Sequence, residues 1–213
     1  MTNARNLVDF FQIAEKLECE YRLTRMSDGQ KQAVASHSWN MAMMAIAVRP
    51  HLTRPVNMER VLELCILHDL PESIAHDIPL HEQTDEIKKQ KRIKEQTAID
   101  TINTLLQDER VADEFGEYEL RQSPESRLVK LLDILDTFIQ HMCAQDLSYV
   151  GTYKNNFYWR AFFSDSFRDK FDYEPILRDI YNEIRTRVAA RLKEELDIDY
   201  TQFLQKEDDN ENV

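Results

Sequence analysis

The stretch CILHDLPESIAHDIP, residues 65–79, runs from apolar residues into two histidines and three carboxylates. In a helix, Asp69 and Glu72 are three residues apart and His68 and Glu72 are four apart, so their side chains can converge on one face. A histidine and a carboxylate at the end of the apolar run LELCIL are costly unless each has a partner, and a divalent cation suits both. The alternative is a helix end that reaches solvent, with Asp69 ionised in water.

Two other segments place the same residue types in apolar helices. The segment VASHSWNMAMMAIA has His37 near its start, and VKLLDILDTF contains Asp133. Each is weak evidence alone, because a single core histidine is more often a hydrogen-bonded structural residue than a ligand. Together with His68 and Asp69 they form the ordered pattern H…HD…D.

With this pattern the sequence resembles the HD-domain phosphohydrolase superfamily. The stretches AVASHSW, LHDLPES, HDIP and VKLLD are most similar to the bacterial HD-domain 5'-deoxyribonucleotidase family and its eukaryotic relatives, over roughly residues 15–145. The resemblance implies that His37, His68, Asp69 and Asp133 hold one divalent metal ion. Mixed nitrogen and oxygen ligands leave Mn, Co, Mg, Ni and Fe as candidates. Glu72 is then expected to orient or deprotonate the attacking water.

The same resemblance identifies residues around the substrate. Asp77 stands at the position of the family's second acidic residue, where it is expected to assist catalysis and contact water or sugar. Arg22 stands where the family has a phosphate-binding arginine, whose guanidinium suits two phosphate oxygens. Leu23 replaces a tryptophan that often packs on the sugar. His76 replaces a glycine, and it either lines the substrate pocket, acts as an extra acid, or lies on the surface.

The implied activity is that of an enzyme, a metal-dependent phosphohydrolase that converts (deoxy)ribonucleoside 5'-monophosphates to nucleoside and phosphate. Two alternatives stay open: a deoxynucleoside triphosphate triphosphohydrolase, and a non-catalytic HD protein that senses metal or nucleotide. A cyclic-nucleotide phosphodiesterase is disfavoured, because two-metal sites of that class need later histidines and only His141 follows His81. The resemblance also implies a homodimer.

The elements that position these residues are expected to be helices. Three glycines and six prolines in 213 residues leave few turn residues, which predicts an all-α fold. Apolar spacing predicts a loop over 26–32 and helices over about residues 4–22, 34–48, 57 onward, 82–107, 123–147 and 174–196. Asn57 and Ser123 are expected to cap two of these helices, and Pro71 is expected to end or kink the helix that Asn57 begins. The basic run KKQKRIK, residues 88–94, is expected to be a solvated helix face, although Lys88 or Lys91 could reach across the cleft. We expect an HD-domain helical bundle over residues 1–150, a helical C-terminal extension over 151–205 packed on the same domain, and a disordered acidic tail over 206–213.

Charge and hydropathy exclude other classes of protein. A net charge of −12 argues against duplex nucleic acid as a partner. The sequence has neither a membrane-spanning stretch nor the layout of a signal peptide, so we expect a cytoplasmic protein. Cys19, Cys65 and Cys143 lack metal-binding spacing and are expected to be reduced packing residues. Most apolar residues in the helix of His37, among them Trp39 and the methionines of NMAMM, are expected to pack in the core.

Overall fold

The computed structural model describes residues 2–76, 85–152 and 157–204. Within these ranges the regular elements are helices apart from one two-stranded hairpin, so the predicted all-α fold is confirmed. Asp77 and the predicted tail lie outside the described residues. The chain divides into two compact units: residues up to 23, 31–49 and 55–133 form the first, and residues 24–30, 50–54 and from 134 onward form the second. The domain division expected above stays a prediction.

The first unit contains most of the helices. Its elements are α1 (Ala4–Glu15), η1 (Lys16–Glu18), α2 (Val34–Val48), α3 (Met58–Leu67), α4 (Glu72–Ala75), α5 (Asp85–Leu106), α6 (Arg110–Leu120) and the beginning of α7 (Pro124–Cys143). The hairpin of β1 (Tyr21–Arg25) and β2 (Lys31–Ala33) joins η1 to α2. Because β2 ends where α2 begins, the hairpin and the helix that carries His37 form one continuous segment.

Local capping explains where the site-bearing helices begin. The side chain of Asn57 accepts hydrogen bonds from the backbone amides of Glu59 and Arg60 at the start of α3, 3.1 and 3.4 Å long. At the start of α7 the hydroxyl of Ser123 accepts from the amide of Ser126 at 3.0 Å. Both residues satisfy amides that lack partners within their helices, as predicted from the sequence.

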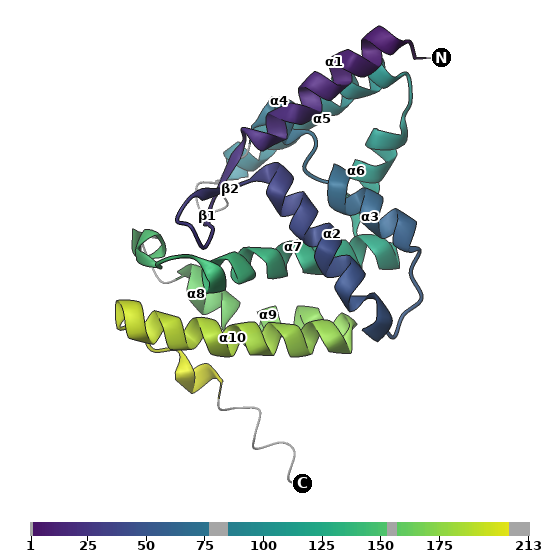
Figure 1. The fold of residues 1–213 in the computed structure, drawn as a ribbon. Helices are drawn as coiled ribbons and strands as arrows, with labels where there is room; N and C mark the ends of the chain where they lie inside the picture. Colours follow the sequence, from purple (N-terminus) through teal and green to yellow (C-terminus); the bar gives the residue numbers. More distant parts are fainter. Residues whose placement is uncertain (1, 77–84, 153–156, 205–213) are drawn as a thin grey trace. The chain divides into compact units, whose positions relative to one another are not determined.

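The core of the first unit fixes the ends of these helices. Leu17, Val34, Leu70, Ile102 and Val111 are buried against one another. In Figure 1, α1 lies along α5, and α2 contacts α3. Leu70 belongs to the turn that follows α3, so its burial anchors the chain directly after His68 and Asp69.

Two predictions about the first unit were wrong, and one helix was missed. The helix expected over 4–22 ends at Glu15, with η1 after it, and part of the expected loop pairs as β2. The residues of β1, YRLTR, include β-formers, and Gly29 takes a φ of 82° at the hairpin turn. Helix α6 was not predicted, although Val111, Phe115 and Tyr118 stand at helical spacing within its charged sequence RVADEFGEYEL.

The expected packing of α2 also needs correction. Met41 is fully buried, but Trp39 is 64% exposed, and Met43 and Ile46 are exposed as well. These three residues follow one another at intervals of four and three, which places them on one outward face of the helix. The helix therefore buries the face that carries His37 and leaves an apolar stripe uncovered within its unit.

The cysteines differ in exposure, since Cys65 is buried while Cys19 and Cys143 are exposed. Burial, with a contribution from the negative charge of Asp133, raises the pKa of the Cys65 thiol to about 12. A thiol with a raised pKa stays neutral at physiological pH and reacts slowly. We therefore expect a thiol-specific reagent at pH 8 to label Cys19 and Cys143 in the native protein and all three in urea. Fast labelling of Cys65 in the native protein would contradict this packing.

The second unit contains the end of α7 and the C-terminal helices. Its other elements are η4 (Ser148–Thr152), α8 (Phe157–Phe162), α9 (Asp165–Arg168), η5 (Asp169–Tyr173), α10 (Pro175–Leu196) and η6 (Thr201–Phe203). Phe162, Phe171 and Tyr181 are buried, and the rings of Phe171 and Tyr181 stack at 4.5 Å. These aromatic side chains therefore pack in the core of the second unit. None of the helices in the described ranges combines the length and apolarity that crossing a bilayer requires.

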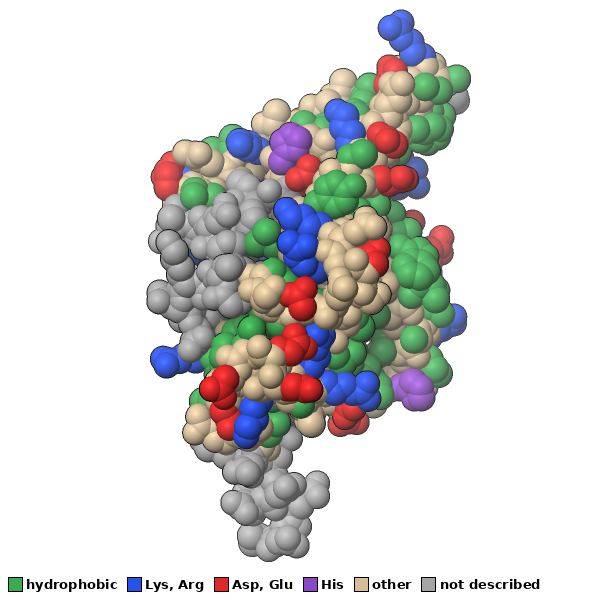
Figure 2. All heavy atoms as spheres, turned by 60° about the vertical axis from the view of Figure 1, so that its left-hand side comes forward, with side chains coloured by type: hydrophobic (Ala, Val, Ile, Leu, Met, Phe, Trp, Pro, Cys, Tyr) green, Lys and Arg blue, Asp and Glu red, His purple; other side chains and the backbone are tan. Residues whose placement is uncertain are grey.

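Charged side chains of both signs lie on the face shown in Figure 2. On the face shown in Figure 2, the described acidic and basic side chains are interspersed with apolar ones and do not form a continuous basic surface. Duplex binding relies on such a surface to displace counterions from phosphates.

Candidate metal centre

Four side chains with metal-binding atoms meet inside the first unit. His37 Nε2 lies 3.3 Å from Asp133 Oδ1 and 3.8 Å from Asp69 Oδ2, and His68 Nε2 lies 3.2 Å from Asp69 Oδ2. Ligand atoms of His37, His68 and Asp69 lie within 4.8 Å of one another. Helix α2 supplies His37, the end of α3 supplies His68 and Asp69, and α7 supplies Asp133. The structure thus brings together the four residues that the sequence pattern singled out.

The tautomer of His68 follows from its backbone contact. Its Nδ1 lies 3.1 Å from the carbonyl oxygen of Cys65. A carbonyl only accepts hydrogen bonds, so Nδ1 carries a proton and donates, which leaves Nε2 facing Asp69. A backbone carbonyl bound to one ring nitrogen commonly orients a histidine for a metal at the other. The buried His68 therefore presents the atom that a cation would need.

The two carboxylates of the cluster are held in their ionised form. Burial opposes their ionisation, but neighbouring positive charge outweighs it. The imidazoles of His68 and His37 hold the pKa of Asp69 below its ordinary value. Lys130 and His37 do the same for Asp133, whose pKa is well below its ordinary value. Two imidazoles and two ionised carboxylates form a mixed nitrogen and oxygen donor set, which fits a divalent transition metal or Mg²⁺.

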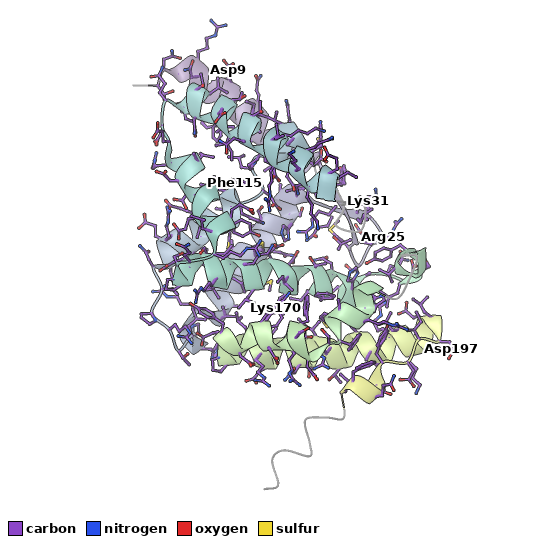
Figure 3. All side chains as sticks on the ribbon, turned by 180° about the vertical axis from the view of Figure 1, so that it is seen from behind. Asp9, Arg25, Lys31, Phe115, Lys170 and Asp197 are labelled. Carbon is purple, nitrogen blue, oxygen red and sulfur yellow. The ribbon has the colours of Figure 1, made fainter. Side chains whose placement is uncertain are left out.

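Asp133 is oriented by a residue that the sequence did not point to. The hydroxyl of Tyr118, in α6, donates to Asp133 Oδ2 at 2.8 Å, and Lys130 Nζ donates to the same oxygen at 2.7 Å. Burial, together with the charges of Asp133 and Asp69, raises the pKa of Tyr118 well above its ordinary value, so the phenol keeps the proton it donates. With Oδ2 engaged, Asp133 turns Oδ1 toward His37. Figure 3 shows α6 from behind, with Phe115 labelled one turn before Tyr118.

Removing the hydroxyl of Tyr118 tests this orientation. In Tyr118→Phe the ring stays packed near His68, at a centroid distance of 5.0 Å in the wild type, but one donor to Asp133 is lost. Partners of metal ligands typically contribute a factor of 10 to 100, so we expect metal affinity to fall about 10-fold. The measurement is a metal titration by calorimetry, with Tyr173→Phe in the second unit as the matched control. Equal affinities of Tyr118→Phe and wild type would contradict the role of the hydroxyl.

Glu72 lies near the cluster on a different helix from the one expected. Helix α3 ends at Leu67, and Pro71 directly precedes α4, which begins with Glu72. The break at Pro71 was predicted, because proline lacks the amide that would continue the helix. The convergence of His68, Asp69 and Glu72 therefore does not depend on a single continuous helix face. The amide of Glu72 donates to the carbonyl of Asp69 at 2.9 Å, so a tight turn keeps the two residues adjacent. Glu72 is only 5% exposed.

The carboxylate of Glu72 is paired with helix α5. Lys91 Nζ donates to Glu72 Oε1 at 3.0 Å and lies 3.4 Å from Glu95 Oε1. Burial raises the pKa of Glu95, and the charge of Lys91 acts in the opposite direction. The sequence favoured a solvated helix face for the run of Lys91 but left open that this lysine reaches inward. The structure shows its ammonium group close to two carboxylates.

The residues predicted to contact substrate are only partly brought together. Arg22, on β1, has Nη2 4.0 Å from Asp133 Oδ1, so the guanidinium borders the cluster. Leu23 is half-buried, and as the next residue of the strand it points to the opposite face from Arg22. His76 is exposed, with its Nδ1 2.9 Å from Glu20 Oε2. It occupies a positive φ of 65°, a conformation that favours the glycine it replaces.

The fold and the cluster together define a helical protein with a candidate site for a divalent cation. An HD domain profile matches residues 14–169. The chain belongs to the HD domain family.

Curated proteins are similar to this chain in sequence at moderate identity. The 5'-deoxynucleotidase HDDC2 of Danio rerio is 36% identical over 114 residues, which are 52% of this chain and 54% of that protein. The chain thus spans about half the length of that relative. HDDC2 of Homo sapiens is 27% identical over 200 residues, 90% of this chain and 92% of that protein. The 5'-deoxynucleotidase hdd1 of Schizosaccharomyces pombe is 27% identical over 63% of this chain and 70% of its own length.

Solved structures show the same fold. A predicted metal-dependent phosphohydrolase from Magnetospirillum magnetotacticum superposes with a TM-score of 0.72 at 21% identity, covering 89% of this chain and 94% of that one. A conserved hypothetical protein from Pyrococcus furiosus superposes with a TM-score of 0.61 at 26% identity, covering 84% of this chain and 99% of that one.

Proposed function

We propose that the protein is a metal-dependent phosphohydrolase that cleaves deoxyribonucleoside 5'-monophosphates to nucleoside and phosphate. The observation that carries the proposal is the convergence of His37, His68, Asp69 and Asp133, with Arg22 at its border. The relatives named as 5'-deoxynucleotidases support the choice of substrate.

The metal in this proposal is held by His37, His68, Asp69 and Asp133. When bound, a divalent ion acidifies a coordinated water and neutralises charge on the phosphoryl group. The candidates are Mn, Co, Mg, Ni and Fe, because each accepts imidazole and carboxylate ligands.

The remaining steps belong to residues of the chain. Arg22 binds two oxygens of the phosphate through its guanidinium fork and holds the phosphorus in line with the attacking water. Glu72 orients that water and accepts its proton as the new P–O bond forms. The bond between phosphorus and the 5' oxygen breaks, that oxygen takes up a proton from solvent, and Glu72 returns the proton it accepted to solvent. Asp77 is proposed as the second acidic group, at the position that precedes α5 in the chain.

The proposal includes a homodimer and a location in the cytoplasm. The exposed apolar stripe of Trp39, Met43 and Ile46 on α2 supports self-association, since burying it would remove apolar surface from water. Sedimentation analysis of the purified chain gives the mass of the assembly directly.

Identification of the products tests the proposed reaction. Ribo- and deoxyribonucleoside mono-, di- and triphosphates are incubated with protein and each candidate metal, and orthophosphate, pyrophosphate and triphosphate are quantified. Orthophosphate from deoxynucleoside monophosphates supports the proposal. The ratio of the rates with deoxyribo- and ribonucleoside monophosphates measures the effect of Leu23 and His76 on sugar selection. Release of triphosphate would instead establish the triphosphohydrolase. A protein that binds metal and nucleotide without turnover would be a sensor.

A further inference from the structure

Lys91 in helix α5 differs from Lys94 of the same helix in its contacts and its exposure. Its ammonium group lies between the carboxylates of Glu72, 3.0 Å away, and Glu95, 3.4 Å away. Its side chain is 19% exposed, whereas Lys94, three residues later, is an exposed residue. A lysine carries three N–H donors, so it can serve both carboxylates at once. This arrangement orders a long side chain that would be flexible in solvent.

The same contacts explain how Glu72 is tolerated in its buried position. An isolated buried carboxylate is strongly disfavoured, and a charge-assisted hydrogen bond is the usual compensation. Helix α4 is a single short helix, so its backbone alone gives Glu72 little support. Helix α5 is 22 residues long and packs against α4. Lys91 therefore connects the side chain of Glu72 to a much longer element.

We propose that Lys91 is a positioning residue that holds the carboxylate of Glu72 against the attacking water, and that Glu95 orients Lys91 for this task. The inference rests on the proposed function, because it assigns Lys91 a role in the same site. Lys91 acts through Glu72 and makes no contact with substrate. Glu95 lies one turn further along the same helix, where a carboxylate can fix the ammonium group from the side opposite Glu72.

The alternative role for Lys91 is to bind a substrate phosphate. The observed contacts disfavour it, because two carboxylates already compensate its single positive charge. A phosphate ligand would require Lys91 to leave Glu72 buried beside another anion. The two roles predict different kinetics: a positioning residue affects kcat, whereas a phosphate contact affects KM first.

The test compares Lys91→Met, Lys91→Arg and Glu95→Gln, with Lys94→Met as the matched control on the exposed part of α5. We expect Lys91→Met to lower kcat about 10- to 100-fold, less than the factor of about 10² to 10⁴ lost with the general base itself, while KM changes less than about threefold. Arginine at position 91 should restore part of kcat, since it keeps the charge and the donors. Glu95→Gln should give a smaller loss of kcat, and Lys94→Met should match wild type. All variants should bind the same amount of metal.

A double-mutant cycle shows whether Lys91 acts through Glu72. Once Glu72 is replaced by glutamine, the further change Lys91→Met should alter kcat less than about twofold, because the residue it positions is already lost. Additive effects, a change confined to KM, or Lys91→Met turnover equal to wild type would each overturn the proposal. Crystal structures of wild type and Lys91→Met provide a readout apart from turnover, and the Glu72 carboxylate should be displaced in the variant. Absence of turnover in the wild type would refute the proposed function, while an unmoved carboxylate would refute this inference separately.

Discussion

Replacing Asp69 with alanine is expected to abolish both metal binding and turnover. Asp69 Oδ2 lies 3.2 Å from His68 Nε2 and 3.8 Å from His37 Nε2, so it is central to the donor set. Loss of a residue that merely supports a ligand costs a factor of 10 to 100, so loss of the ligand itself should lower metal affinity by more than about 100-fold. Metal analysis after dialysis measures the loss of binding, and an assay of phosphate release measures the loss of turnover.

The control for Asp69→Ala is Asp179→Ala, which removes an exposed carboxylate from α10. It should retain the metal content and the turnover of the wild type. Circular dichroism should show that both variants keep their helices. A fully active Asp69→Ala protein would exclude this cluster as the metal site.

Replacing Glu72 with glutamine should separate catalysis from metal binding. Glutamine keeps the size of the side chain and an oxygen that can accept from Lys91, but it cannot accept a proton from water. General-base catalysis typically contributes a factor of 10² to 10⁴, so we expect kcat to fall by about 10³-fold. Metal content should stay at the wild-type level, because Glu72 is outside the proposed ligand set.

The two variants together give a clear contrast. Asp69→Ala should lose metal and turnover, and Glu72→Gln should lose turnover alone. If Glu72→Gln also lost its metal, Glu72 would be a ligand and the assignment of the general base would need to change. If it kept full turnover, another residue would activate the water.

The sequence predicted the parts of the site that depend on local signals. Apolar spacing located α2 at the observed bounds, and Asn57 and Ser123 marked the starts of α3 and α7. These signals are local because capping and helix periodicity involve residues only a few positions apart. The pattern H…HD…D then selected the residues that meet in space.

The sequence did not predict contacts that depend on distant pairing. Tyr118 lies in a charged segment that was not recognised as a helix, and nothing local indicates its hydrogen bond to Asp133. Lys91 belongs to a basic run typical of a solvated helix face, yet it pairs with Glu72 nineteen residues earlier. The β1 and β2 hairpin was missed because strand formation depends on pairing between segments. In each case tertiary packing decided the outcome.

The most direct test of the central claim is metal removal and restoration with turnover measured at each stage. The purified protein is treated with a chelator, dialysed, and assayed for orthophosphate release from a deoxynucleoside 5'-monophosphate before and after each candidate metal is added. We predict that turnover disappears with the metal, returns when about one equivalent of a divalent ion per chain is bound, and fails to return in Asp69→Ala. Turnover that persists in the metal-depleted protein would contradict the account.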